Sequence, residues 1–270
     1  MSLPPPPVLE HCYRHPDRET GRRCTRCGKP ACGECLVQVA VGSNCLDCVK
    51  AARPDVKTRA KFWNARQPTL VTYSLIAINA AIYVWTMASN RNEVDLALYK
   101  PSLHAGEYYR LISSGFLHFG LFHIGMNMLL LFQLGQLLEP AIGRVRFGLL
   151  YFASLLGGSL GALILSPLAV TGGASGAVFG LMAAAAIGMH RRGVNIFRTG
   201  IGTLLVLNLV ITFTIPGISV GGHVGGAIAG AICGFVILAP RHAALPAWAS
   251  YATPIAIVVV SVMASVAIAG

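Results

Sequence analysis

The chain has 270 residues, of which 54% are hydrophobic and only 11% are charged, and its mean hydropathy is +0.63. Soluble domains carry roughly 25% charged residues, so this composition excludes an ordinary soluble globular protein. The formal net charge of +11 would suit a nucleic-acid-binding protein. We exclude nucleic acid as a partner, because the basic residues outside the N-terminal region cluster beside apolar segments, where membrane topology explains them.

Polar and apolar residues are divided between the two ends of the chain. Residues 1–68 hold twelve of the 21 Lys and Arg residues, six of the ten acidic residues and seven of the eight cysteines. Beyond Glu139 the chain contains no Asp or Glu. This pattern predicts an all-α polytopic membrane protein that follows a small polar domain. The predicted domains are a cysteine-rich finger at 1–50, a basic juxtamembrane linker at 51–68, a membrane core at 69–240 and one further transmembrane helix at 241–270.

Ligand pairs with a single repeated spacing occupy the first 50 residues: Cys12-x2-His15, Cys24-x2-Cys27, Cys32-x2-Cys35 and Cys45-x2-Cys48. These eight ligands are enough for two tetrahedral Zn²⁺ sites. The alternative is a disulfide framework, but a histidine occupies one pair position and seven cysteines are an odd number. Spacing alone does not fix which pairs share an ion, and His11 could replace His15. A finger of this size has too small an apolar core to fold without metal.

The finger resembles a B-box-type zinc finger, a cross-braced module with two zinc ions. That family usually ends in a histidine pair, where this chain has two cysteines. The resemblance implies two structural Zn²⁺ sites, one formed by Cys12, His15, Cys32 and Cys35 and the other by Cys24, Cys27, Cys45 and Cys48. Since all eight ligands come from the protein, we expect a module that recruits a cytoplasmic protein partner rather than a catalytic metal centre. Its thiolates favour a reducing compartment.

Seven apolar segments follow, and about 20 residues are needed to cross roughly 30 Å of hydrocarbon. We predict transmembrane helices at 69–88, 118–138, 147–165, 175–190, 200–215, 222–239 and 252–269. Basic residues precede the first segment and occupy the loops after the second, fourth and sixth, whereas the loops at 166–174 and 216–221 carry no charge. The positive-inside rule then places the N-terminus in the cytoplasm. We expect an integral protein of a bacterial plasma membrane, with the lipid bilayer as its solvent.

Two fragments inside the apolar region carry a nucleophile and a base: Gly173-Ala174-Ser175-Gly176 and Gly222-His223-Val224-Gly225-Gly226. An ionisable residue in hydrocarbon is costly and therefore indicates function. Ser175 and His223 both begin segments that run inward from the outer side, so the site should open outward. Gly226 and Gly230 share the helix face of His223, and they allow close approach of the helix that starts at Ser175. The alternative for these small residues is helix packing alone.

His123 and Asn127 are four residues apart and share one face of the second predicted helix. Both can donate hydrogen bonds, so together with the Ser175 backbone N–H they suit an oxyanion hole. The alternative is a polar pair that joins two helices. A Ser-His-Asp triad needs a carboxylate beside the histidine. Because Glu139 lies at the cytoplasmic end and the other acids lie in the loop after the first helix, we predict a Ser–His dyad that needs no cofactor.

Together these motifs resemble a rhomboid intramembrane serine protease over roughly residues 65–240. The matching patterns are His118-x4-His123-x3-Asn127, Gly173-Ala174-Ser175-Gly176 and His223-x2-Gly226-x3-Gly230. The resemblance implies a six-helix bundle plus a seventh C-terminal transmembrane helix. It makes Ser175 the nucleophile and His223 the general base, with His123 and Asn127 lining the oxyanion hole. His118 would be a supporting residue near the route of water access.

Other positions follow the family pattern with small changes. Phe179 stands where many relatives have a tyrosine that stacks on the histidine, so we expect slower or retuned activity. Glu107-Tyr108-Tyr109-Arg110 is similar to an aromatic-Arg signature of the first loop, and Glu139 and Gly143 match a structural turn. The implied function is an intramembrane endopeptidase that cleaves transmembrane protein substrates near their outer boundary. One alternative is a catalytically silent relative that binds membrane clients, and a transporter is disfavoured because no duplicated pattern of broken or charged helices occurs.

Overall fold

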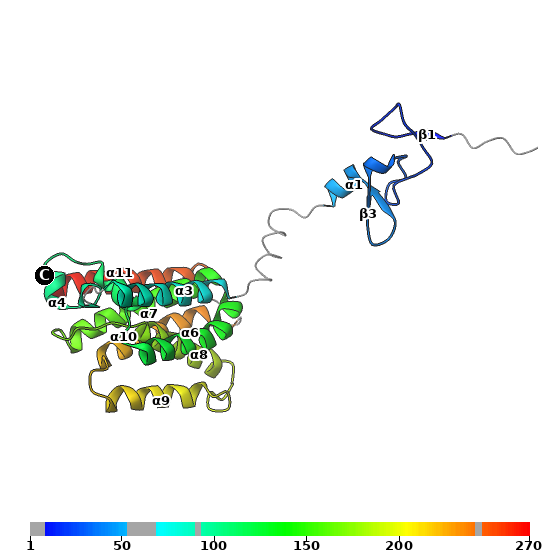
Figure 1. Cartoon of the computed structure of the whole chain (residues 1–270). Helices are drawn as coiled ribbons and strands as arrows, with labels where there is room; N and C mark the ends of the chain where they lie inside the picture. Colours follow the sequence, from blue (N-terminus) through cyan, green and yellow to red (C-terminus); the bar gives the residue numbers. More distant parts are fainter. Residues whose placement is uncertain (1–8, 53–68, 90–92, 241–244) are drawn as a thin grey trace, which may run out of the picture. The chain divides into compact units, whose positions relative to one another are not determined.

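A computed structural model describes residues 9–52, 69–89, 93–240 and 245–270 of the chain. The chain divides into two compact units, Met1–Arg66 and Gln67–Gly270. The predicted basic linker at 51–68 lies almost entirely outside the described residues. The two units are drawn in Figure 1 and are described separately below.

The N-terminal unit is built from short elements. Two antiparallel hairpins, β1 (Glu10–His11) with β2 (Glu19–Thr20) and β3 (Leu36–Gln38) with β4 (Ser43–Cys45), flank the turn η1 (Gly33–Cys35) and precede α1 (Leu46–Ala51). Its buried cluster consists of Cys12, Ala31, Cys32 and Cys35. A core of one alanine and three thiols removes very little apolar surface from water, so other interactions must stabilise this unit.

The C-terminal unit is a bundle of apolar helices, as predicted. Its long helices are α3 (Leu70–Ala88), α6 (Leu121–Ile142), α7 (Arg144–Leu165), α8 (Ser175–His190), α9 (Ile201–Thr214), α10 (Val220–Ile237) and α11 (Ala249–Ala269). Among the described residues, five of these are long and apolar enough to cross a membrane, whereas α8 and α9 are shorter apolar helices. Figure 1 shows α9 set apart from the other helices of the bundle.

Two predicted helix starts need correction. The second segment begins at Leu121 rather than at residue 118, because Gly120 has a φ of 106° and ends the preceding turn. The third begins at Arg144 rather than at residue 147, since Gly143 has a φ of 83° and separates it from α6. Glycine adopts such left-handed angles without steric cost, so both positions break the helix. His118 therefore precedes α6 instead of lying within it.

Helix α7 is the centre of the bundle. Phe147, Leu150 and Tyr151 on this helix are fully buried. Its glycines allow α10 to approach closely: a Cβ placed on Gly158 would lie 2.9 Å from the carbonyl oxygen of Gly222. A real Cβ at that distance would clash, so the helix spacing depends on the absence of side chains.

Glu139 joins the C-terminal part of α6 to the start of α3. Its carboxylate is fully buried and accepts hydrogen bonds from the backbone N–H groups of Val71 and Thr72 at 2.9 and 2.8 Å. The hydroxyl of Thr72 donates to the same carboxylate at 2.6 Å. The first N–H groups of a helix have no partner within the helix and attract negative charge. Glu139 therefore caps α3 and has a structural role.

The segment between α3 and α6 contains η2 (Glu93–Asp95), α4 (Lys100–His104), α5 (Arg110–Ser113) and η3 (Ser114–Phe116). Buried Arg110 holds it together: its Nε donates to Glu107 at 2.6 Å, and its Nη1 donates to the carbonyls of Val94 and Ala97. Leu98 exchanges two backbone hydrogen bonds with Thr171, in the loop before α8. These bonds fix the loop that carries Ser175.

Candidate functional site

The loop before α8 places Ser175 at the start of that helix. Gly173 has a φ of 129°, and its backbone N–H donates to the Ser114 carbonyl at 2.8 Å. The backbone N–H of Ala174 donates to His118 Nε2 at 3.3 Å. Two consecutive N–H groups are thus tied to the preceding segment, which leaves Ser175 at a defined position with helix N-terminal amides beside it.

His123 borders the same loop. A Cβ placed on Gly173 would lie 2.7 Å from His123 Nε2 and 3.8 Å from Ser175 Oγ, so both side chains surround this glycine. The Phe119 N–H donates to His123 Nδ1 at 3.4 Å, which puts the proton of the neutral ring on Nε2. His123 therefore offers a donor on the side of Gly173. Asn127, 5% exposed, uses one amide proton to donate to the His123 carbonyl at 2.9 Å.

His118 is fully buried behind the serine loop. Its ring lies edge-on to that of His123, with centroids 5.0 Å apart. Since Nε2 accepts from Ala174, the ring proton sits on Nδ1, for which no hydrogen-bond partner occurs among the described residues. His118 thus orients the loop through its contact with the backbone.

His223 lies in the first turn of α10 and is 7% exposed. Its ring stacks on Phe179, with centroids 4.1 Å apart and planes at 14°. Its Nδ1 is 2.7 Å from the hydroxyl of Thr212 on α9. Within the described part of the chain, no hydrogen bond joins His223 to Ser175.

Small residues bring α8 and α10 together at this point. A Cβ on Gly226 would clash with the Gly176 carbonyl and lie 3.0 Å from the Gly176 Cα. A Cβ on Gly230 would clash in the same way with the backbone of Gly180. The interface therefore contains backbone against backbone, directly beside the first turn of α8.

A cavity of about 650 Å³ contains these groups. Its lining includes Ser175, His223, His123, Asn127 and Phe179. This volume lies within the range of sites that bind peptides or small molecules. The cavity thus combines a hydroxyl, an imidazole and hydrogen-bond donors at a helix N-terminus, which is the set that acyl transfer requires.

Thr212 was not among the residues predicted from the sequence. It belongs to an apolar helix without any motif, and it is 2% exposed. No spacing links it to His223, because the two residues approach each other only through the turn between α9 and α10. The contact becomes visible only when the two helices are placed in three dimensions.

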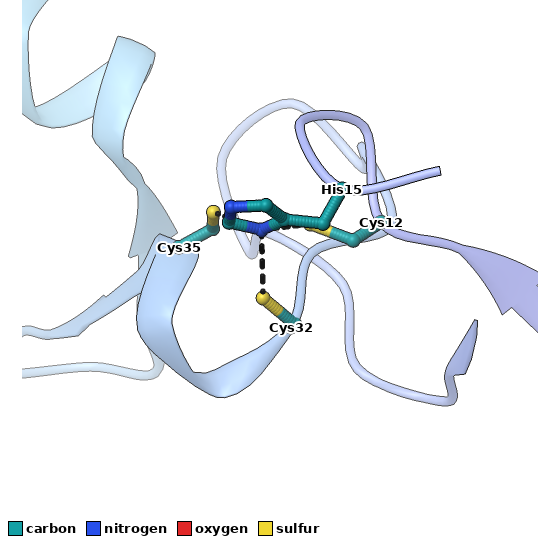
Figure 2. Close-up of side chains that lie close together, drawn as sticks. All are labelled: Cys12, His15, Cys32 and Cys35. Atoms are coloured by element: carbon teal, nitrogen blue, oxygen red, sulfur yellow. Dashed lines mark hydrogen bonds between the residues drawn. The ribbon is translucent and has the colours of Figure 1, made fainter. Parts of the chain in front are cut away.

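The N-terminal unit contains two clusters of ligand atoms, within each of which all ligand atoms lie within 4.8 Å of one another. The clusters are Cys12, His15, Cys32 and Cys35, and Cys24, Cys27, Cys45 and Cys48. Figure 2 shows the His15 ring among three sulfur atoms, with its Nδ1 3.4 Å from Cys32 and Cys35 and 3.8 Å from Cys12. His11, the alternative ligand, is exposed on β1 and pairs with Glu19.

The distances in these clusters suit a tetrahedral metal site. With Zn–S and Zn–N bonds of about 2.3 and 2.0–2.1 Å, tetrahedral edges are about 3.8 Å for S–S and about 3.6 Å for S–N. The sulfur atoms of Cys27 and Cys45 are 3.7 Å apart, far beyond a disulfide bond of about 2.05 Å. All seven cysteines of this unit are free thiols.

Each cluster also stabilises negative charge. Burial acts to raise the pKa of the Cys12 thiol, but hydrogen bonds from the Cys32 and Arg14 amides and from His15 outweigh it and lower the pKa to about 6. The pKa of Cys24 is lowered to about 6 in the same way, by hydrogen bonds that outweigh burial. Burial and neighbouring thiols raise the pKa of Cys35 to about 11. A divalent cation would relieve the crowding of thiolates that these opposite shifts reflect.

Comparison with known proteins agrees with the geometry. A profile of the rhomboid domain matches residues 105–240, half of the chain. The chain is 31% identical to Rhomboid protease GluP of Bacillus subtilis (strain 168) over 176 residues, which are 62% of this chain and 34% of that protein. It is 45% identical to RHOMBOID-like protein 1 of Arabidopsis thaliana over 82 residues, 30% of this chain and 21% of that protein.

A third relative is Rhomboid protein 1, mitochondrial, of Saccharomyces cerevisiae, 33% identical over 122 residues, which are 43% of this chain and 35% of that protein. The chain spans about a third or less of the length of these relatives. The matched domain nevertheless contains the whole cavity from Ser114 to His223. The chain therefore belongs to the rhomboid family, whose members are generally intramembrane serine proteases.

Proposed function

We propose that the protein is an intramembrane serine endopeptidase that hydrolyses peptide bonds in or near the transmembrane segments of membrane-protein substrates. The observation that carries the proposal is the single cavity in which Ser175, His223, His123 and Asn127 meet. The stack of His223 on Phe179 supports it, because the stack holds the imidazole in one plane.

In the proposed reaction, Ser175 Oγ attacks the scissile carbonyl and His223 Nε2 accepts the hydroxyl proton. Negative charge develops on the carbonyl oxygen, where the His123 Nε2–H, the free amide proton of Asn127 and the Ser175 backbone N–H can donate. His223 then gives its proton to the leaving amine, and water hydrolyses the acyl-enzyme. The Ser175–His223 hydrogen bond forms when substrate binds, since catalytic hydrogen bonds often tighten only then.

The orientation that fits this function has the N-terminus in the cytoplasm of a bacterial cell. Arg144 and Arg146 at the α6–α7 turn and Arg191 and Arg192 after α8 support it, because basic loops stay on the cytoplasmic side. Ser175 and His223 begin helices at the opposite ends of these loops. The cavity then opens outward, and cleavage occurs near the outer membrane boundary.

For the finger, we infer that each four-ligand cluster holds one structural Zn²⁺ and that the folded finger recruits a cytoplasmic protein partner. The tetrahedral edge lengths support zinc, and the lack of an open ligand position supports a structural rather than catalytic role. Metal analysis of purified protein should find about two zinc ions per chain. Deletion of residues 1–50 should change the choice among several substrates while leaving the Ser175 chemistry intact.

The catalytic assignment is tested with Ser175→Ala in liposomes that contain a model transmembrane substrate. Cleavage should fall to background, and a fluorophosphonate probe should no longer label the protein. Ser261→Ala, in α11 and outside the cavity lining, is the matched control and should cleave normally. A catalytically silent relative that binds clients would show neither labelling nor cleavage in the wild type, and that result would reject the proposal.

A further inference from the structure

Thr212 makes two short contacts through one hydroxyl. Its Oγ1 is 2.6 Å from the carbonyl oxygen of Asn208, one turn earlier on α9, and 2.7 Å from His223 Nδ1. Two oxygens at 2.6 Å repel each other unless a proton lies between them, so the single hydroxyl proton points to Asn208. The Thr212 oxygen must then accept the second hydrogen bond, and the donor is the Nδ1–H of His223.

This order of protons fixes the state of the imidazole. A neutral imidazole carries one proton, so a proton on Nδ1 leaves the lone pair on Nε2. The ring is held on its face by Phe179 and at its edge by Thr212, which opposes a flip that would exchange the two nitrogens. We propose that Thr212 is a positioning residue that holds His223 in the tautomer able to accept a proton from Ser175. This inference rests on the proposed function, because it specifies how the base acts.

The position of Thr212 connects this tautomer to the placement of α9. The structure describes every residue of α9, and only Gly202 and Thr212 among them are buried. Among the hydrogen bonds of the described residues, the one between Thr212 and His223 is the bond that joins α9 to another helix. If α9 moves away from the bundle, Nδ1 loses its partner and neither tautomer is selected. His223 is therefore a competent base only while α9 is packed against α10.

Kinetics of three variants test the role of the hydroxyl. Thr212→Val keeps the shape and removes the hydroxyl, so kcat should fall about 3- to 10-fold, as expected for one neutral hydrogen bond, while KM stays within about twofold. Thr212→Ser should recover most of the lost rate. Thr214→Val is the matched control, because Thr214 makes the same hydrogen bond one turn back, to Val210 at 2.7 Å, and is exposed. It should keep the wild-type kcat.

A spectroscopic measurement tests the tautomer without relying on catalysis. In protein labelled with ¹⁵N-histidine, the His223 signals are identified by their loss in His223→Gln. The wild type should show a protonated Nδ1 and an unprotonated Nε2, and Thr212→Val should show a mixture of tautomers. A wild-type proton on Nε2 would overturn the proposal even if Thr212→Val failed to fold.

Two further results would also overturn it: an unchanged kcat in Thr212→Val, or equal losses in Thr212→Val and Thr214→Val. Failure of the proposed function gives a different pattern, since Ser175→Ala would then cleave as well as the wild type. In that case the ¹⁵N signals would still report whether Thr212 sets the His223 tautomer.

Discussion

A single methyl group at Gly226 should disable the site from the opposite side of the helix pair. The Cβ of Gly226→Ala would lie 3.0 Å from the Gly176 Cα and closer still to the Gly176 carbonyl. Carbon atoms pack at about 3.5–4.0 Å, so α8 and α10 must separate by roughly 0.5–1 Å. Overpacking of this kind costs about 1–3 kcal/mol of stability.

The displacement matters more than the stability, because Ser175 and His223 lie on the two helices that separate. A misplacement of about 1 Å in a reacting group reduces rates by roughly 100-fold. We expect Gly226→Ala to lower kcat/KM for a model transmembrane substrate by about that factor. Its thermal unfolding in detergent should shift down by only a few degrees, so most of the protein stays folded at the assay temperature.

Gly148→Ala is the matched control for this prediction. Gly148 also lies within a helix, α7, but the nearest atom to its Cβ would be 4.0 Å away, which is an ordinary contact. Its rate should equal that of the wild type. If Gly226→Ala also kept the wild-type rate and unfolding temperature, the backbone contact would not set the distance between nucleophile and base, and the reasoning would be wrong.

Three further perturbations follow from single contacts. Glu139→Gln replaces an acceptor oxygen by an amide that faces backbone donors, so it should lower the free energy of unfolding by about 2–4 kcal/mol in thermal or denaturant melts, whereas Gln136→Ala should cost less than about 1 kcal/mol. Phe179→Leu removes the ring that holds His223 and should reduce kcat about 3- to 10-fold, while Phe179→Tyr should preserve it. Chelation of metal should unfold the finger, seen as loss of its amide NMR dispersion, without changing the thermal transition of the helical unit.

Apolar composition predicted the helices well because hydrocarbon thickness fixes their length. The errors occurred where a glycine overrides hydropathy. Gly120 and Gly143 adopt positive φ, so α6 and α7 begin away from the apolar limits of their segments. Both glycines are visible in the sequence, but a glycine inside an apolar run is just as often part of a helix.

The ligand pairs of the finger were also visible, since Cys-x2-Cys spacing is local. Which pairs share a site is a tertiary property that spacing does not contain. The structure brings the Cys12 pair to the Cys32 pair and the Cys24 pair to the Cys45 pair, the interleaved arrangement that the B-box resemblance implied. Thr212 lies at the other extreme, because its role depends on one contact between two helices and no local pattern marks it.

The absence of a carboxylate beside His223 has a physical reason that Glu139 illustrates. The carboxylate of Glu139 is fully buried only because three donors at a helix N-terminus surround it. The position next to His223 Nδ1 belongs to an apolar helix whose own N–H groups are already used, so a carboxylate there would have the imidazole as its main partner and would be poorly solvated. A threonine can orient the ring without a buried charge, because its oxygen accepts from Nδ1 while its proton goes to a helix carbonyl. The cost is that a hydroxyl stabilises the imidazolium formed during catalysis less than an acid would.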